Sequence, residues 1–189
     1  MSPSIRLSVI VPTCGRRTLA RAVASALTQL SHEDEVIVVG DGPQPAAQAF
    51  CRTISPVVQY VEGPMTRCWG NTQRQVGLRC AVGDYVAFLD DDDIFVPGAL
   101  PVMKAAVAES PSQPVLFQFV DRHGAVIWCD REVRQGNVST QCVCVPNVTE
   151  KLGTWGERYE GDYDFITSTL ACYGAGSVVW RPNIVQVQR

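Results

Sequence analysis

Short apolar runs alternate with helix-like segments through the first half of the chain. Each run of β-branched residues ends in a turn-forming or acidic residue, which is typical of a buried strand. Between these runs, apolar residues recur at the three-to-four-residue spacing of an amphipathic helix. The predicted strands cover residues 7–11, 35–39, 57–61 and 85–89, and the predicted helices cover residues 19–30, 46–54, 71–81 and 98–109. This βαβα order predicts a mostly parallel sheet with helices on both faces.

The pattern changes after Pro114. Residues 115–120 and 125–129 are predicted to form a hairpin, because four turn-forming or polar residues separate two apolar runs. A strand at 140–145, a helix at 162–171 and a short strand at 177–180 are expected to follow, whereas residues 146–161 show no clear period. We therefore expect one α/β domain over residues 1–189, built from a regular half, 1–113, and a mixed half, 114–189.

Composition narrows the class of protein. A hydrophobic fraction of 46% and a net charge of −3 are typical of a globular protein with no global attraction to nucleic acid. The start has no charged leader with an apolar stretch, and apolar runs such as residues 36–39 are far too short to span a bilayer, so we expect a cytoplasmic protein. The eight cysteines include no C-x-x-C pair and are interpreted as free thiols rather than zinc ligands.

Four aspartates follow the predicted strand at residues 85–89. Asp90, Asp91, Asp92 and Asp93 repel one another, and a hard divalent cation offsets such charge better than water does. Alternate side chains of an Asp-x-Asp pair on a turn point to the same side, so Asp90 and Asp92 are candidate ligands of one Mn²⁺ or Mg²⁺. The alternative is a solvated turn in which an aspartate caps the next helix.

Further polar residues lie where the other predicted strands end. Thr13 follows the first strand and Asp41 the second, and ligands of open parallel sheets bind beyond these carboxyl ends. Asp41 accepts a hydrogen bond from a nucleobase or ribose in one interpretation and belongs to an ordinary Asp-Gly turn in the other. Three arginines also have two interpretations. They either contact phosphate or base of a ligand or are solvated helix residues: Arg16, Arg17 and Arg74.

A second acidic cluster lies at residues 160–165. A carboxylate here is a candidate general base, which takes the proton from an attacking hydroxyl. The alternative is a helix N-terminus, where negative charge interacts favourably with the macrodipole. Nearby Trp155 and Tyr159 are candidates for stacking on a sugar or base ring, or for the core.

Several separated segments resemble family 2 glycosyltransferases with the GT-A fold. They are VIVPT at 9–13, VVGDGP at 38–43, RQVGL at 74–78, AVGDYVAFLDDDD at 81–93 and GDYDF at 161–165. The resemblance covers about residues 7 to 170, in order, and the segment leading into the aspartates is its most specific part. It implies a mostly parallel central sheet flanked by helices, with a nucleotide-sugar-binding half, 1–113, and a smaller mixed acceptor-side sheet in residues 114–189.

The resemblance also implies roles for individual residues. Asp90 and Asp92 would form the Asp-x-Asp motif that binds ribose and the metal, and Asp162 would be the general base. Gly161 stands where the family often has glutamate, so Glu160 stays an alternative base. The implied donor-binding residues are Pro12, Thr13, Asp41, Arg74, Asp90 and Asp91.

Together these features predict a metal-dependent inverting glycosyltransferase that moves a sugar from a nucleotide-sugar, a UDP-sugar, to an acceptor hydroxyl by single displacement. One alternative is a non-catalytic module that binds nucleotide sugars. Another is a sugar nucleotidyltransferase, but residues 13–17 lack the lysine-bearing, glycine-rich loop that it needs. The sequence leaves the acceptor open among a glycan, a protein, a lipid-linked sugar and a modified nucleobase, and it leaves the oligomeric state open.

Overall fold

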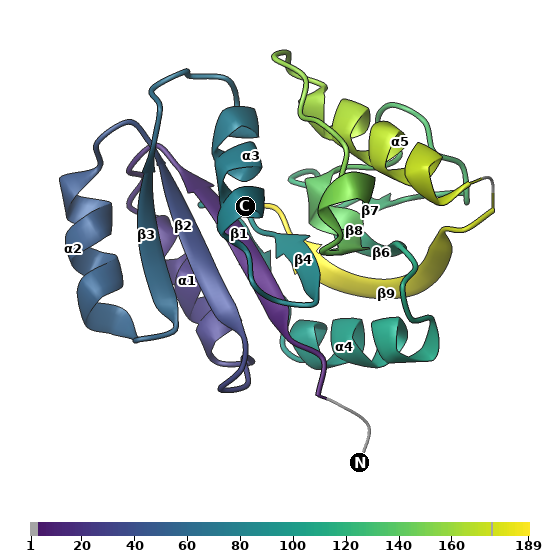
Figure 1. Ribbon diagram of the computed structural model, residues 1–189, viewed down its shortest axis with the longest axis horizontal. Helices are drawn as coiled ribbons and strands as arrows, with labels where there is room; N and C mark the ends of the chain where they lie inside the picture. Colours follow the sequence, from purple (N-terminus) through teal and green to yellow (C-terminus); the bar gives the residue numbers. More distant parts are fainter. Residues whose placement is uncertain (1–3, 175) are drawn as a thin grey trace.

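One twisted sheet runs through the molecule (Figure 1). The computed structural model describes residues 4–174 and 176–189, and within them nine strands join in the order β3-β2-β1-β4-β8-β6-β9-β5, with β7 paired to β6. The strands are β1 (Leu7–Thr13), β2 (Glu35–Asp41), β3 (Val58–Gly63), β4 (Tyr85–Phe88), β5 (Ile94–Phe95), β6 (Val115–Val120), β7 (Val126–Ile127), β8 (Val143–Pro146) and β9 (Val179–Val187).

The first four strands of the chain form the predicted parallel unit. β1 pairs in parallel with β2 on one side and with β4 on the other, and β3 extends β2 in parallel. β8 then pairs antiparallel to both β4 and β6, while β9 runs parallel to β6 and antiparallel to β5. The mixed strands of the later half thus continue the same sheet and do not form a separate one.

Helices cover both faces of this sheet. They are α1 (Leu19–Leu27), α2 (Pro45–Ile54), α3 (Asn71–Cys80), α4 (Ala99–Glu109) and α5 (Gly161–Tyr173), with short 3₁₀ turns η1 (Thr140–Cys142) and η2 (Thr149–Lys151). Because strand side chains alternate between faces, Val9 and Val11 pack with α1, α2 and α4, whereas Ile10 packs with α3 and α5. The two cores therefore share the buried central strands.

Most predicted elements differ from the structure by a few residues at their ends, and three differences have a clear physical reason. β1 continues through Pro12 to Thr13. A proline is tolerated at this position because the pairing with β4 ends at Ile10, so that the strand has only β2 as a neighbour there. Residues 140–142 form η1 instead of the start of a strand. The last strand runs on to Val187, because a register shift opposite Phe117 and Gln118 accommodates Pro182.

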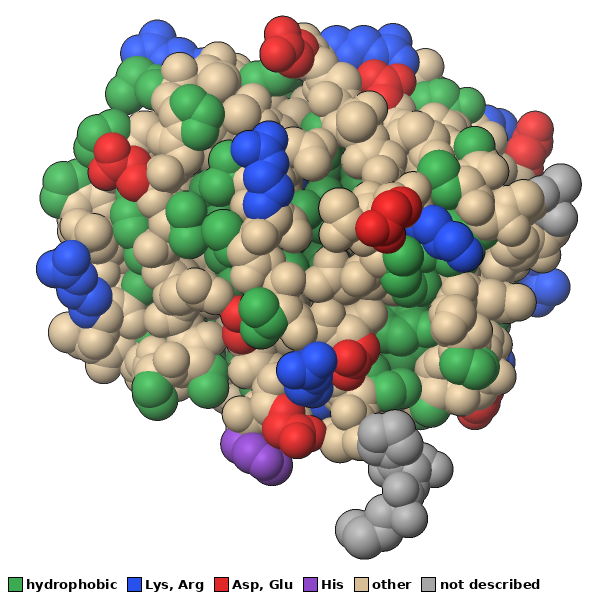
Figure 2. All heavy atoms as spheres, viewed as in Figure 1, with side chains coloured by type: hydrophobic (Ala, Val, Ile, Leu, Met, Phe, Trp, Pro, Cys, Tyr) green, Lys and Arg blue, Asp and Glu red, His purple; other side chains and the backbone are tan. Residues whose placement is uncertain are grey.

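Charged side chains of both signs are interspersed on the face of the molecule shown in Figure 2. This agrees with the near balance of 16 basic and 19 acidic residues. Within the described residues, every helix falls short of the length and apolarity needed to cross a bilayer.

Candidate functional site

A large cleft opens where the parallel strands end. Its volume is about 1040 Å³, and its walls come from the ends of β1, β2 and β4, from α3 and α5, and from the segment around η1. Strand direction explains the gathering, because parallel strands carry the residues after their carboxyl ends to one edge of the sheet. All the donor, metal and base residues that the resemblance implies line this cleft: Pro12, Thr13, Asp41, Arg74, Asp90, Asp91, Asp92 and Asp162. Of the two arginines considered for phosphate, Arg16 lines it and the exposed Arg17 does not.

The aspartate run divides into two parts. Asp90, Asp92 and Asp93 each offer a carboxylate oxygen, and these oxygens lie within 4.8 Å of one another. Asp91 is instead buried against β1, where it accepts hydrogen bonds from Thr13 Oγ1 (2.6 Å) and Arg16 Nη1 (2.9 Å). The three-carboxylate group suits Mn²⁺ or Mg²⁺, which prefer oxygen ligands. It contains the predicted pair Asp90 and Asp92 and adds Asp93.

Burial makes ionisation of these three carboxyl groups less favourable. Burial and the neighbouring charge of Asp90 raise the pKa of the Asp93 carboxyl to about 7. Burial also raises the pKa of Asp92, an effect that Arg16 opposes through an ion pair of 2.7 Å. A divalent cation would relieve the same repulsion, so the electrostatics of these carboxylates fit a metal site.

Arg74 is the buried cation of the cleft. Its side chain is only 6% exposed and forms an ion pair with Asp90, so the structure rules out the reading of Arg74 as a solvated helix residue. Its Nη1 also donates to the carbonyl of Trp69 (2.9 Å), and the guanidinium lies over the Trp155 ring at 5.1 Å. Arg74 therefore fixes Asp90 and the loop before α3 at the same time.

Asp41 anchors the loop that leads into α3. Its carboxylate accepts hydrogen bonds from the backbone N–H groups of Thr66 (2.7 Å) and Arg67 (3.0 Å) and from Gln73 Nε2 (3.0 Å). This acidic side chain thus shapes the wall of the cleft around the candidate donor residues. The contacts go beyond those of an isolated Asp-Gly turn.

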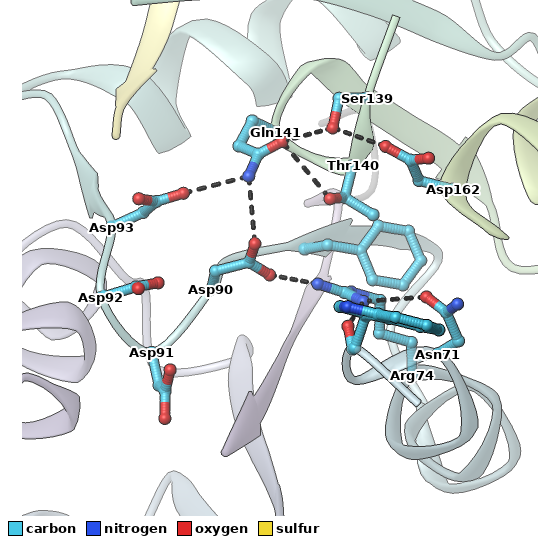
Figure 3. A network of polar contacts seen from close by, with 12 residues as sticks. Asn71, Arg74, Asp90, Asp91, Asp92, Asp93, Ser139, Thr140, Gln141 and Asp162 are labelled. Carbon is cyan, nitrogen blue, oxygen red and sulfur yellow. Dashed lines mark hydrogen bonds and ion pairs between the residues drawn. The ribbon is translucent and has the colours of Figure 1, made fainter. Parts of the chain in front are cut away.

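Asp162 lines the same cleft as Arg74 and is connected to the aspartates through two further side chains, Ser139 and Gln141 (Figure 3). Ser139 Oγ is 2.7 Å from Asp162 Oδ2 and 2.6 Å from Gln141 Oε1. Gln141 Nε2 in turn donates to Asp90 Oδ2 and Asp93 Oδ2, both at 3.0 Å. A continuous chain of close polar contacts through Ser139 and Gln141 therefore connects the candidate base to the candidate metal ligands.

Ser139 has fewer protons than acceptor oxygens beside it. The Ser139 hydroxyl has one proton but two acceptor oxygens beside it, so an ionised Asp162 competes with Gln141 for that proton. Once protonated, Asp162 can donate to Ser139 Oγ while Ser139 donates to Gln141. Glu160 also lines the cleft and is half-buried, and among the described residues its side chain makes one long ion-pair contact of 3.9 Å, with Arg158.

Sequence reasoning missed Ser139, Gln141 and Asn71. Asn71 Nδ2 donates to the carbonyls of Gly156 (2.9 Å) and Arg158 (2.8 Å), and so fastens the start of α3 to the loop before α5. These three residues carry ordinary polar side chains without a motif spacing. Their role depends on tertiary contacts between segments far apart in the chain, from 23 residues between Ser139 and Asp162 to 87 residues between Asn71 and Arg158.

Comparison with known proteins identifies the family of this chain. The model of glycosyl transferase family 2 matches residues 8–140. An uncharacterized glycosyltransferase of Haemophilus influenzae is 32% identical over 114 residues, covering 56% of this chain and 36% of the relative. The GalNAc(5)-diNAcBac-PP-undecaprenol beta-1,3-glucosyltransferase of Campylobacter jejuni is 31% identical over 102 residues, covering 52% of this chain and 33% of the relative. The chain thus spans about a third of the length of these two relatives.

The solved structures include S. aureus TarS 1-349 in complex with UDP-GlcNAc. It superposes with a TM-score of 0.79 at 17% identity, covering 97% of this chain and 58% of TarS 1-349. The likeness confirms the expected GT-A fold. With the family model matching residues 8–140, the chain belongs to glycosyl transferase family 2.

Proposed function

We propose that this domain is an inverting glycosyltransferase that moves a sugar from a UDP-sugar to an acceptor hydroxyl with the help of Mn²⁺ or Mg²⁺. One observation carries the proposal: a single cleft holds a three-carboxylate group, a buried arginine and a further carboxylate that is connected to that group through Ser139 and Gln141. Membership of the family supports sugar transfer. The UDP-GlcNAc complex of TarS supports the choice of donor.

The donor would occupy the strand-end side of the cleft. Thr13 and Asp41 would contact the nucleoside, Pro12 and Asp91 would shape its pocket, and Arg74 would lie near the base or diphosphate. Asp90, Asp92 and Asp93 would hold the metal, which when bound supplies positive charge for the departing nucleoside diphosphate.

Asp162 would take the proton from the acceptor hydroxyl. A carboxylate in this role needs to be ionised before transfer and satisfied by hydrogen bonds afterwards. Its Oδ1 accepts the backbone N–H of Tyr163 (2.7 Å), which orients the carboxylate at the first turn of α5. Its Oδ2 faces Ser139, which can exchange its role from donor to acceptor when Asp162 becomes protonated.

Thermal melting tests the donor and metal site. UDP and UDP-sugars at about a hundred times their dissociation constant stabilise the fold by about 2.7 kcal/mol, a rise of several degrees in melting temperature. We expect this rise with Mn²⁺ or Mg²⁺ and not with EDTA, and we expect Asp92→Asn to abolish it. Glu109→Gln, which removes one negative charge at the end of α4 away from the cleft, is the control and should keep the rise. Equal shifts with and without metal would contradict the metal site.

The base is tested by comparing Asp162→Asn with Glu160→Gln. Because general base catalysis contributes roughly 10²–10⁴-fold, Asp162→Asn should lower kcat by at least about a hundredfold while keeping the UDP-induced rise in melting temperature. Release of UDP from UDP-sugars in the presence of an acceptor panel measures this. Glu160→Gln should stay within a few-fold of the unmodified protein. The reverse ranking of the two variants would assign the base to Glu160.

A further inference from the structure

Two exposed aromatic side chains meet at the mouth of the cleft. Trp69, in the loop before α3, is 58% exposed, and Tyr159, in the loop before α5, is 69% exposed. Their ring centroids lie 6.0 Å apart at an interplanar angle of 85°, and both residues line the cleft. Trp155, by contrast, is buried in the core and stacked on Phe165 at 4.5 Å. Large exposed aromatic surface at the edge of a cleft is typical of a binding site.

The backbone of Trp69 is held in an uncommon conformation. Its φ of 48° lies in the left-handed region, which bulky residues rarely adopt and which persists only where surrounding contacts impose it. The carbonyl of Trp69 accepts the hydrogen bond from Arg74, and Gly70 follows with a φ of 79°. The exposed indole is therefore positioned by its backbone and not by burial of the ring.

The loop before α5, which carries Tyr159, is also held by hydrogen bonds. Asn71 holds the carbonyls of Gly156 and Arg158, on either side of the turn that leads to Tyr159. Gly161 approaches Asn71 so closely that a Cβ there would collide with Asn71 Nδ2 and with the Gly156 carbonyl. Both aromatic rings thus stand on loops that are tied to each other.

Each residue of the pair has a neighbour that belongs to the chemical part of the cleft: the Trp69 carbonyl accepts from Arg74, which pairs with Asp90, and Tyr159 lies just before Asp162 in the chain. In the loop before α3, Met65 packs against Gly42, beside Asp41 at the nucleoside end, whereas Trp69 packs against Tyr159. Tyr159 precedes Asp162 by three residues. The position of the pair therefore matches the acceptor, whose hydroxyl must reach Asp162, better than it matches the nucleobase.

We propose that Trp69 and Tyr159 form a platform that binds a pyranose ring of a carbohydrate acceptor. The inference rests on the proposed glycosyl transfer. The two ring planes meet at nearly a right angle and both side chains are mostly exposed, so each ring keeps aromatic surface open to a ligand. The C–H face of a pyranose packs on such apolar rings, while its hydroxyls stay at the edge, within reach of polar residues of the cleft.

The test is binding of simple sugars, monitored on the indole N–H resonance of Trp69 in NMR spectra. Glucose, N-acetylglucosamine, cellobiose and chitobiose are the probes, and sorbitol, which carries hydroxyls but no ring, is the control. We expect at least one ring sugar to shift this resonance saturably in the millimolar range and sorbitol to leave it unchanged. Tyr159→Ala should weaken that binding about three- to tenfold, and Tyr159→Phe should weaken it less.

Binding of UDP with Mn²⁺ separates this inference from the function on which it rests. Tyr159→Ala should weaken sugar binding at the Trp69 resonance, and both Tyr159→Ala and Trp69→Ala should keep the UDP-induced rise in melting temperature, with Trp69→Phe as a variant that preserves an aromatic ring. Loss of UDP binding in Trp69→Ala with unchanged sugar binding in Tyr159→Ala would overturn the platform and assign Trp69 to the nucleobase. UDP binding without binding of any ring sugar would overturn the platform alone.

Discussion

At the scale of single residues, the electrostatics of the cleft depend on which buried polar groups interact with each carboxylate of the aspartate run. Gln141 donates both of its amide protons, one to Asp90 and one to Asp93, and is itself only 3% exposed. Arg74 neutralises Asp90 from the other side. Within residues 4–174 and 176–189, Asp93 forms no ion pair with a cationic side chain and accepts hydrogen bonds from Gln141 and the backbone N–H of Arg189. It is therefore the carboxylate of the group whose ionisation costs most.

This leads to a pH dependence in the metal-free protein. The folded state raises the pKa of Asp93 from its ordinary value of 3.8 to about 7, so the folded protein binds a proton more tightly than the unfolded chain between these values. Stability is therefore lost as pH rises through that window, by up to about 1.4 kcal/mol per pH unit. We expect the melting temperature in EDTA to fall between pH 5 and pH 8.

Asp93→Asn should flatten this dependence and melt higher than the unmodified protein at pH 8 in EDTA. Glu33→Gln, an exposed charge-matched control, should keep the slope of the unmodified protein. The same melting curves with Mn²⁺ should show a smaller stabilisation of Asp93→Asn, if Asp93 acts as a ligand. An unchanged slope in Asp93→Asn would contradict its assignment as the titrating group.

At the scale of elements, a buried carboxylate forms hydrogen bonds that connect segments far apart in the chain. Asp34, just before β2, is fully buried and accepts hydrogen bonds from the backbone N–H of Leu7 (2.8 Å) and from Ser31. Lys104 of α4 completes the set at 2.6 Å. Although burial alone raises the pKa of Asp34, these hydrogen bonds hold it below its usual range. Asp34 thus joins the starts of β1 and β2 to α4.

Asp34→Asn should lower the free energy of unfolding by about 2 kcal/mol at pH 7, because Lys104 loses its charged partner and a backbone contact weakens. The lowered pKa means that the contribution of Asp34 is present above the unfolded value of 3.8 and is lost as pH falls through the folded value. Urea denaturation should therefore show a gap between the two proteins that closes in acid. Glu109→Gln, which removes an exposed ion pair with Arg181, should change stability by less than about 1 kcal/mol.

At the scale of the whole molecule, the later half completes the sheet and brings the last pieces of the site. β8 lies between β4 and β6, so the sheet crosses from the first half of the chain to the second at this strand. α5 and β8 supply Phe165, Ile166, Val143 and Val145 to the core on one face. β9 returns towards the aspartates, where Gln186 Nε2 donates to the Phe88 carbonyl at 2.6 Å.

A fragment of residues 1–140, the part that ends with the family match, should therefore not fold cooperatively. It would leave β4 without its neighbour β8 and expose the core that α5 covers. Circular dichroism during heating should show a broad, weak transition for this fragment and a sharp one for residues 1–189. A sharp transition of the fragment would mean that the parallel half forms a stable unit by itself.

The sequence alone determined the parallel half of the fold and most of the candidate site. Apolar runs with β-branched residues can be read locally, and the acidic or turn-forming residues that end them are assigned to one edge by the direction of parallel strands. Asp41, Asp90, Asp92 and Asp162 were predicted in this way or by the family resemblance, and all line one cleft. The last strand, Val179–Val187, was predicted to end at residue 180. The proline within it argues against a longer strand in the sequence, and the bulge that accommodates this proline is visible only in the structure.

Only the tertiary structure decided which polar side chains complete the site. Ser139 and Gln141 lie in a segment without a clear motif, and they reach Asp162, Asp90 and Asp93 because β8 inserts beside β4. Trp155 and Tyr159 could not be separated from sequence, yet one is buried and the other exposed. The physical reason is the same in both cases. Local propensity depends on residues within one element, whereas burial and hydrogen-bond partners depend on which elements meet.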